Sequence, residues 1–191
     1  MSLSTGTHLS DLLARSQAGL QALERELGRL ERWGTHLRTR LGDGGRLLAA
    51  GNGGSAALAE HLTAELVGRF DRERPAFSAL ALFGPASVTA LANDYGYEEV
   101  FARQVAAHGR PGDVLVTLST SGRRPNLVRA GAEARRRGLV TWALTGPAPN
   151  PLAQGADDAL AVPYPETSCI QDVQQVAVHL LCLSFELAGE R

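Results

Sequence analysis

The sequence predicts a single α/β domain in which helices cover both faces of a parallel β-sheet. From residue 46 onward, short apolar runs alternate with helical stretches, which is the pattern of βαβ units. Two of the strand-to-helix turns are rich in glycine and hydroxyl residues, as at the ligand-binding edge of open α/β sheets. With 191 residues, 44% hydrophobic and 20% charged, the chain is large enough for one well-buried core. We expect one domain over 1–191, with a helical segment at 1–42 and an α/β core at 45–188.

The first forty residues are expected to be helical. Leucines recur there at spacings of three and four, and Gly34 interrupts the series. This apolar stripe fits packing against the chain's own domain, and it equally fits a seam with another copy. Asp43, Gly44 and Gly45 then end the helix. The stripe consists of Leu20, Leu23, Leu27, Leu30, Leu37 and Leu41.

The alternation after residue 45 defines the expected core. Predicted strands lie at 47–50, 78–83, 114–118, 140–144 and 159–162. Predicted helices lie at 55–68, 86–92, 98–108, 125–137 and 168–187. Strands that alternate with helices favour a three-layer sandwich of the flavodoxin-like or Rossmann-like kind.

Charge and residue usage exclude several functional classes. The net charge of −1 provides no basic field for nucleic acid or an anionic membrane. No apolar run reaches the roughly 18 residues of a membrane span, and the polar N-terminus does not resemble a signal peptide. The two cysteines, Cys169 and Cys182, fit a reducing cytoplasm better than a disulfide framework, so we expect a cytoplasmic protein. The absence of lysine excludes Schiff-base catalysis and a Walker A nucleotide loop.

Two turns are candidates for phosphate binding. One reads GNGGS at 51–55, and the other reads STSG at 119–122. Glycine lets backbone N–H groups approach an anion, and hydroxyls add hydrogen bonds at a helix N-terminus. Serine and glycine are also common in ordinary turns, but two such turns in one sheet favour a phosphorylated metabolite. A third segment, NDYG at 93–96, fits either a plain turn or a carboxylate delivered to substrate hydroxyls.

Polar residues on two otherwise apolar helices are candidates for the chemistry. His61 and Glu65, four residues apart, share one helix face and fit either a pair of metal ligands or an acid/base pair. On the last helix, polar residues repeat at intervals of four: Gln171, Gln175 and His179. Because buried polar groups without partners are costly, we expect these three to face a cavity or a neighbouring chain.

Together, these motifs resemble those of the sugar isomerase (SIS) domain family and, within it, the phosphoheptose isomerases. The motifs are GNGGS, H-x-x-x-E, G-R at 68–69, R-P at 74–75, NDYG, STSG and a C-terminal I-Q-D…H, spread over about residues 45–187. The resemblance implies a single SIS domain whose N-terminal helices serve oligomerisation, in a homotetramer with active sites between subunits. It implies conversion of sedoheptulose 7-phosphate to D-glycero-D-manno-heptose 7-phosphate by an enediol mechanism, in nucleotide-activated heptose synthesis.

The resemblance also implies roles for individual residues. Glu65 would be the base and His179 the acid, on helices that meet across a subunit boundary. One zinc ion per subunit would be bound by His61, Glu65, Gln171 and His179, with no nucleotide cofactor. Arg124 stands where the family usually has a small residue, and it would either replace a hydroxyl contact to phosphate with a charge-assisted bond or point to solvent. The other implied substrate contacts are Asn52, Gly53, Gly54, Ser55, Asn93, Asp94, Ser119, Thr120, Ser121 and Gln171.

The chemistry of the reaction agrees with these roles. A proton must leave C1 and another must reach C2, which one carboxylate can accomplish while an imidazole moves the oxygen-bound protons. Zinc raises a conflict, because Glu65 cannot be both a tight ligand and an unhindered base. Gln171 and His179 are also about 12 Å apart along one helix, so a shared ion requires extended side chains or two chains.

Two alternative functions remain. One is that of a non-catalytic tetrameric SIS protein that binds the replication initiator DnaA; that SIS protein lacks counterparts of Glu65 and His179. The other is isomerisation of another ketose phosphate.

Overall fold

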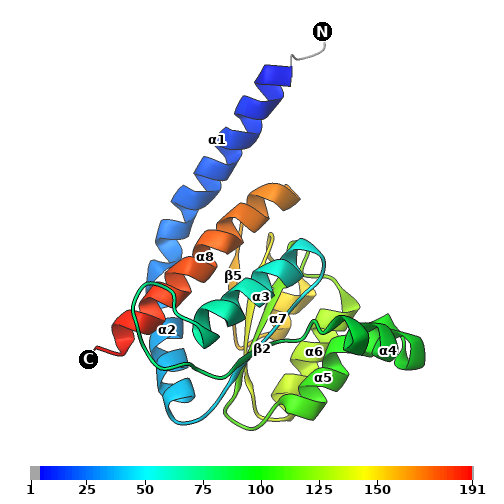
Figure 1. The fold of residues 1–191 in the computed structure, drawn as a ribbon. Coiled ribbons are helices and arrows are strands. Elements are labelled where there is room, and N and C mark those ends of the chain that lie inside the picture. The colour runs from blue at the N-terminus through cyan, green and yellow to red at the C-terminus, as the bar shows by residue number, and fades with distance from the viewer. Residues whose placement is uncertain (1–4, 191) are drawn as a thin grey trace.

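A parallel sheet of five strands forms the centre of residues 5–190, the part of the chain that this computed structural model describes (Figure 1). The spatial order is β2-β1-β3-β4-β5, which is the flavodoxin-like order with its switch point between β1 and β3. The predicted α/β fold is therefore confirmed. The strands are β1 (Leu47–Gly51), β2 (Ala79–Ala81), β3 (Val114–Ser119), β4 (Val140–Thr145) and β5 (Asp158–Ala161).

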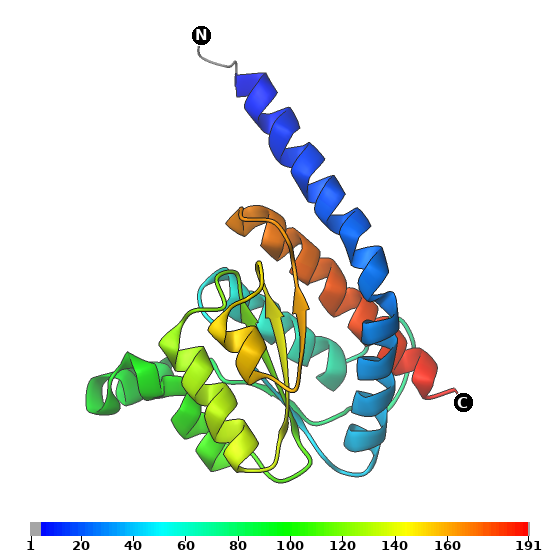
Figure 2. The same ribbon diagram turned by 180° about the vertical axis from the view of Figure 1, so that it is seen from behind.

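Helices cover both faces of the sheet, as the two opposite views show (Figures 1 and 2). Side chains of β1 alternate between two hydrophobic cores: Leu47 and Ala49 face one, and Leu48 and Ala50 face the other. Burial on both faces explains why the strands appear in the sequence as continuous apolar runs. The first core is covered by α2 (Leu27–Gly42), α3 (Gly54–Val67) and α8 (Thr167–Ala188). The second is covered by α5 (Val100–His108), α6 (Pro125–Arg136) and α7 (Pro151–Gly155).

The N-terminal helical region consists of α1 (Thr5–Leu23), a 3-10 turn η1 (Glu24–Glu26) and α2. Gly34 lies inside α2, where a Cβ would be 2.3 Å from the Ser184 Oγ of α8. Glycine therefore permits the close approach of these two helices. The leucine stripe divides: Leu23, Leu30, Leu37 and Leu41 are buried in the chain's own core, whereas Leu20 and Leu27 are 36% and 43% exposed. Beyond this packing, α1 projects away from the body of the molecule (Figures 1 and 2).

Two further segments complete the fold. The predicted helix at 98–108 is split into a 3-10 turn η2 (Tyr97–Glu99) and α5. Before it lies α4 (Pro85–Tyr95), at the edge of the molecule, where every residue is at least partly exposed. Within the described residues, no helix combines the length and the apolar character needed to cross a membrane. Cys169 and Cys182 are both buried in α8 as free thiols.

Candidate active site

The carboxyl ends of β1 and β3 bring the two glycine-rich turns together. The strands are paired in register up to Gly51 and Leu118, so the turns that follow them are neighbours. Gly51 is required for the first turn, because a Cβ would lie 2.3 Å from the Ser55 carbonyl oxygen. Gly53 has a φ of 54°, and α3 starts at the next residue with the side chain of Ser55 buried. The first turn therefore places a helix N-terminus and a hydroxyl at the sheet edge where phosphate was predicted to bind.

A hydrogen bond within the second turn stabilises it. The buried Ser119 Oγ accepts a hydrogen bond from the Gly122 N–H at 3.1 Å. Gly122 has a φ of 60°, and a Cβ there would lie 2.0 Å from Oδ1 of the buried Asn150. Ser119 thus shapes the turn as well as offering a hydroxyl. Of the remaining predicted contacts here, Thr120 is partly buried, and Ser121 and Arg124 are exposed.

A pair of amide side chains connects the two turns. Asn52 Nδ2 donates to Asn126 Oδ1 at 3.1 Å, and Asn126 Nδ2 donates back to Asn52 Oδ1 at 2.9 Å. The Tyr97 hydroxyl also donates to Asn52 Oδ1, at 2.8 Å. Asn52, predicted to contact the sugar, therefore has an amide that holds the turns in place. The predicted contacts Asn93 and Asp94 are exposed at the end of α4, where Asn93 Nδ2 donates to Asp94 Oδ1 at 3.3 Å.

Helices α3 and α8 pack side by side and run in the same direction, because their early and late residues meet in the same order. Near their N-terminal ends, a Cβ on Gly54 would lie 2.4 Å from Gln171 Nε2. The Gln171 amide therefore lies directly against the first turn of α3. A Cβ at position 54 would therefore require the Gln171 amide to shift.

About two turns further along both helices lies a cluster of three titratable side chains. His61 Nε2 and His179 Nε2 are 3.0 Å apart, and His61 Nε2 is 3.5 Å from Glu65 Oε1. Gln175 Nε2 lies 2.8 Å from His179 Nε2, so the Gln175 amide donates to this imidazole. The Phe70 ring packs beside the His179 ring, with centroids 5.6 Å apart. We name His61, Glu65 and His179 the histidine–glutamate cluster.

Glu65 and His179 both lie next to His61 within one chain, and their expected meeting across a subunit boundary stays a prediction. His61 contacts Glu65, which lies on the same helix α3, and His179, which lies on α8. Sequence reasoning placed His61 and Glu65 on one face correctly, but it could not give the packing of α3 against α8. It noted Gln175 only as part of a polar stripe, and it assigned no role to Phe70, Tyr97 or Asn126.

The buried Cys182 thiol lies near this cluster and takes no part in its chemistry. Burial raises the pKa of this thiol to about 12, and the Glu65 and Glu186 carboxylates act in the same direction, against the opposing effect of Arg74. The thiol is therefore protonated at neutral pH and supplies no nucleophile.

The donor types of the cluster suit zinc, because two imidazoles and one carboxylate form a common zinc ligand set. In the described part of the chain, no three histidine, cysteine, aspartate or glutamate side chains are already arranged around a common point for a metal ion. Gln171 lies against Gly54, two turns of α8 before His179, and so belongs to the phosphate turn of its own chain. The roles predicted for these residues remain predictions.

Comparison with known proteins assigns the chain to a family. The family model described as the SIS domain matches residues 13–146. A phosphoheptose isomerase of Streptomyces coelicolor is 57% identical over 176 residues, which cover 92% of this chain and 76% of that protein. The chain therefore belongs to the SIS-domain family and, within it, to the phosphoheptose isomerases.

Solved structures agree with this assignment. The structure of a phosphoheptose isomerase from Francisella tularensis superposes with a TM-score of 0.91 at 31% identity, covering 97% of this chain and all of the other. A phosphoheptose isomerase structure from Neisseria gonorrhoeae gives a TM-score of 0.88 at 35% identity, with 96% and 100% coverage.

Proposed function

We propose that this protein isomerises sedoheptulose 7-phosphate to D-glycero-D-manno-heptose 7-phosphate in the cytoplasm, as a step of heptose biosynthesis. The observation that carries the proposal is the histidine–glutamate cluster, which lies on α3, the helix that follows the first predicted phosphate turn, and on α8, which packs against α3. The similarity of the chain to phosphoheptose isomerases supports the reaction class. The non-catalytic alternative is disfavoured because Glu65 and His179, which the DnaA-binding relative lacks, are both present.

In the proposed mechanism, the two turns hold the phosphate and the cluster moves the protons. The N–H groups at the start of α3 and the hydroxyls of Ser55, Thr120 and Ser121 bind the phosphate. The Glu65 carboxylate removes the proton from C1 and returns one to C2. His179 exchanges the protons of the substrate hydroxyl and carbonyl oxygens, so that neither oxygen carries a full charge in the enediol.

We further propose that the active enzyme is a homotetramer with its sites between subunits. Glu65 lies about 15 Å along the α3 axis from Ser55, which favours a site that takes the phosphate turns and the cluster from different copies. A groove of about 890 Å³ between α2 and α8 also supports assembly. Its lining combines leucines with polar and charged residues; the leucines include Leu27, Leu30, Leu183 and Leu187.

We also propose that His61, Glu65 and His179 would hold a zinc ion. The ion would supply Lewis-acid stabilisation of negative charge that develops on the substrate oxygens. A Gln171 ligand would come from a second copy, since Gln171 of the same chain lies against Gly54.

The test is turnover in deuterated water. Purified full-length protein is incubated with sedoheptulose 7-phosphate, with and without added zinc, while aldose formation and deuterium incorporation at C2 are followed by NMR. We expect both. Neither product nor exchange in either condition would exclude this substrate. Turnover of a different ketose phosphate in the same assay would replace the substrate while retaining the isomerase class.

A further inference from the structure

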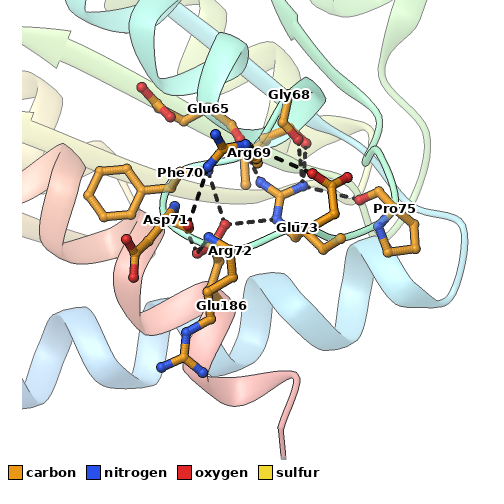
Figure 3. A network of polar contacts seen from close by, with 11 residues as sticks. Glu65, Gly68, Arg69, Phe70, Asp71, Arg72, Glu73, Pro75 and Glu186 are labelled. Atoms are coloured by element: carbon orange, nitrogen blue, oxygen red, sulfur yellow. Dashed lines mark hydrogen bonds and ion pairs between the residues drawn. The ribbon is translucent and has the colours of Figure 1, made fainter.

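The loop between α3 and β2, residues 68–75, carries the G-R and R-P motifs but no role in the proposed mechanism. We propose that Glu186 and Arg74 are positioning residues that hold this loop, so that Phe70 packs against His179 and the end of α3 that bears Glu65 stays docked on α8. Figure 3 shows the Glu186 side chain beside the loop residues Phe70, Asp71 and Arg72. This inference depends on the proposed isomerase function, since it concerns the same histidine–glutamate cluster.

Glu186 is a buried carboxylate that accepts hydrogen bonds from the loop. It lies seven residues after His179, two turns further along the same face of α8, and its side chain is 3% exposed. Burial disfavours the charged carboxylate, but the hydrogen bonds it accepts outweigh that effect and hold the Glu186 pKa below its ordinary value. The donors are the backbone N–H groups of Phe70, Asp71 and Arg72, at 3.0, 3.1 and 3.1 Å, and Arg74 Nε at 3.1 Å.

Arg74 ties the same carboxylate to the end of α3. Its side chain is 8% exposed, and its Nη1 donates to the carbonyl oxygens of Leu66, Gly68 and Pro75 at 3.0 to 3.1 Å. Its Nη2 donates to the Glu65 carbonyl oxygen at 2.5 Å. A guanidinium at this place neutralises the partial negative charge of the helix C-terminus and satisfies carbonyls that have no partner within the helix. An ammonium group could not reach this set of acceptors in one plane.

The Arg74–Glu186 pair is connected to the histidine–glutamate cluster through backbone groups. It holds Phe70 by the main-chain N–H group, and the Phe70 ring forms one wall beside the His179 ring. It also holds the main chain of Glu65, whose side chain is 3.5 Å from His61. The Arg74–Glu186 pair thus holds Glu65 by its backbone and holds His179 through the neighbouring Phe70 ring. Its effect on the reaction is therefore to position these two residues.

Steady-state kinetics with sedoheptulose 7-phosphate separate positioning from simple stabilisation. The variants are Glu186→Gln, Arg74→Lys and Phe70→Leu, each studied as the full chain and checked for folding by circular dichroism. We expect kcat to fall about 10- to 100-fold in the first two, with KM within about twofold, because small displacements of catalytic groups affect the chemical step. Phe70→Leu, which leaves the ion pair intact, is expected to lower kcat about 3- to 10-fold.

Glu133→Gln is the matched control. The Glu133 carboxylate also pairs with two arginines, Arg136 and Arg137, but it lies on α6 at the opposite face of the sheet. We expect this variant to lose stability and keep the wild-type kcat.

Full kcat in a folded Glu186→Gln variant would overturn the proposal, as would a rise in KM alone, which would indicate substrate binding. If Glu186→Gln does not fold, unchanged kcat in Phe70→Leu overturns it instead. Inactive wild-type protein would overturn the proposed function and this inference together, whereas active wild type with fully active variants overturns the inference alone.

Discussion

His61 and His179 are joined by a hydrogen bond of 3.0 Å between their Nε2 atoms, although 118 residues separate them in the sequence. The bond links the middle of α3 to the middle of α8 at the point where Glu65 also approaches. His61, a proposed zinc ligand, therefore also connects Glu65, the proposed base, to His179, the proposed acid.

Removing either proposed proton-transfer group should abolish most of the activity. Glu65→Gln and His179→Gln keep the size of each side chain, and each is expected to lower kcat by about 10²- to 10⁴-fold, the usual contribution of a general acid or base. The measurement is aldose formation from sedoheptulose 7-phosphate, with size-exclusion chromatography to confirm assembly. A full rate in either variant would remove that residue from the mechanism.

The zinc proposal predicts a defined metal content. Protein purified without chelator should contain about one zinc per chain by mass spectrometry, since two imidazoles and a carboxylate form a strong site. His61→Ala should lose this zinc, whereas His108→Ala, on α5 at the other face of the sheet, should keep it. Equal zinc in both variants would place the metal elsewhere.

The bridge between the two turns should control substrate affinity. Asn126→Ala removes the partner of the Asn52 amide, and the loss of two partly buried hydrogen bonds is expected to cost about 1–3 kcal/mol. Because the bridge holds the phosphate turns and touches no proton-transfer group, KM should rise about 5- to 30-fold while kcat changes little. An unchanged KM would mean that the turns keep their arrangement without the bridge.

Two glycines in helices should respond in opposite directions to alanine. Gly34→Ala places a methyl group 2.3 Å from Ser184 Oγ and should lower the free energy of unfolding by about 1–3 kcal/mol. Gly131→Ala, in α6, meets nothing within 4 Å and should raise it by about 0.5–1 kcal/mol. Chemical denaturation measures both. A neutral Gly34→Ala would show that α2 and α8 separate easily.

Acid should destabilise the protein through two carboxylates. Burial opposes ionisation of Glu133 and Glu186, but hydrogen bonds from arginines and backbone N–H groups lower both pKa values. Their stabilisation is present above the ordinary glutamate pKa of 4.5 and is lost as the pH falls through the lower folded value. The melting temperature should therefore fall steeply below about pH 4.5. Glu133→Gln should flatten this slope, and an identical slope would exclude Glu133 as a contributor.

The fold was predictable because its signals are local. Alternating apolar runs and helical stretches are visible within short windows, and so are the glycines that turn β1 and β3 into helices. The helix α7 was not predicted because its five residues are too few to show a period.

The site was predictable only in part. The spacing of His61 and Glu65 is local, whereas the Asn52–Asn126 bridge spans 74 residues and the Arg74–Glu186 pair spans 112. In the sequence, a buried arginine or glutamate is indistinguishable from a solvated one, and only the tertiary fold supplies its partner.

The projecting helix α1 has a consequence for the thermodynamics of the whole chain. It carries Leu9 and Leu13, which are 65% and 62% exposed. A helix of this length is marginal in water on its own, so most of its order comes from tertiary or quaternary contacts. If those contacts are made with other copies, as the family resemblance implies for the N-terminal helices, folding of α1 and association are one linked equilibrium. The midpoint of thermal unfolding would then rise with protein concentration, and dilution alone would loosen the N-terminal helix before the sheet.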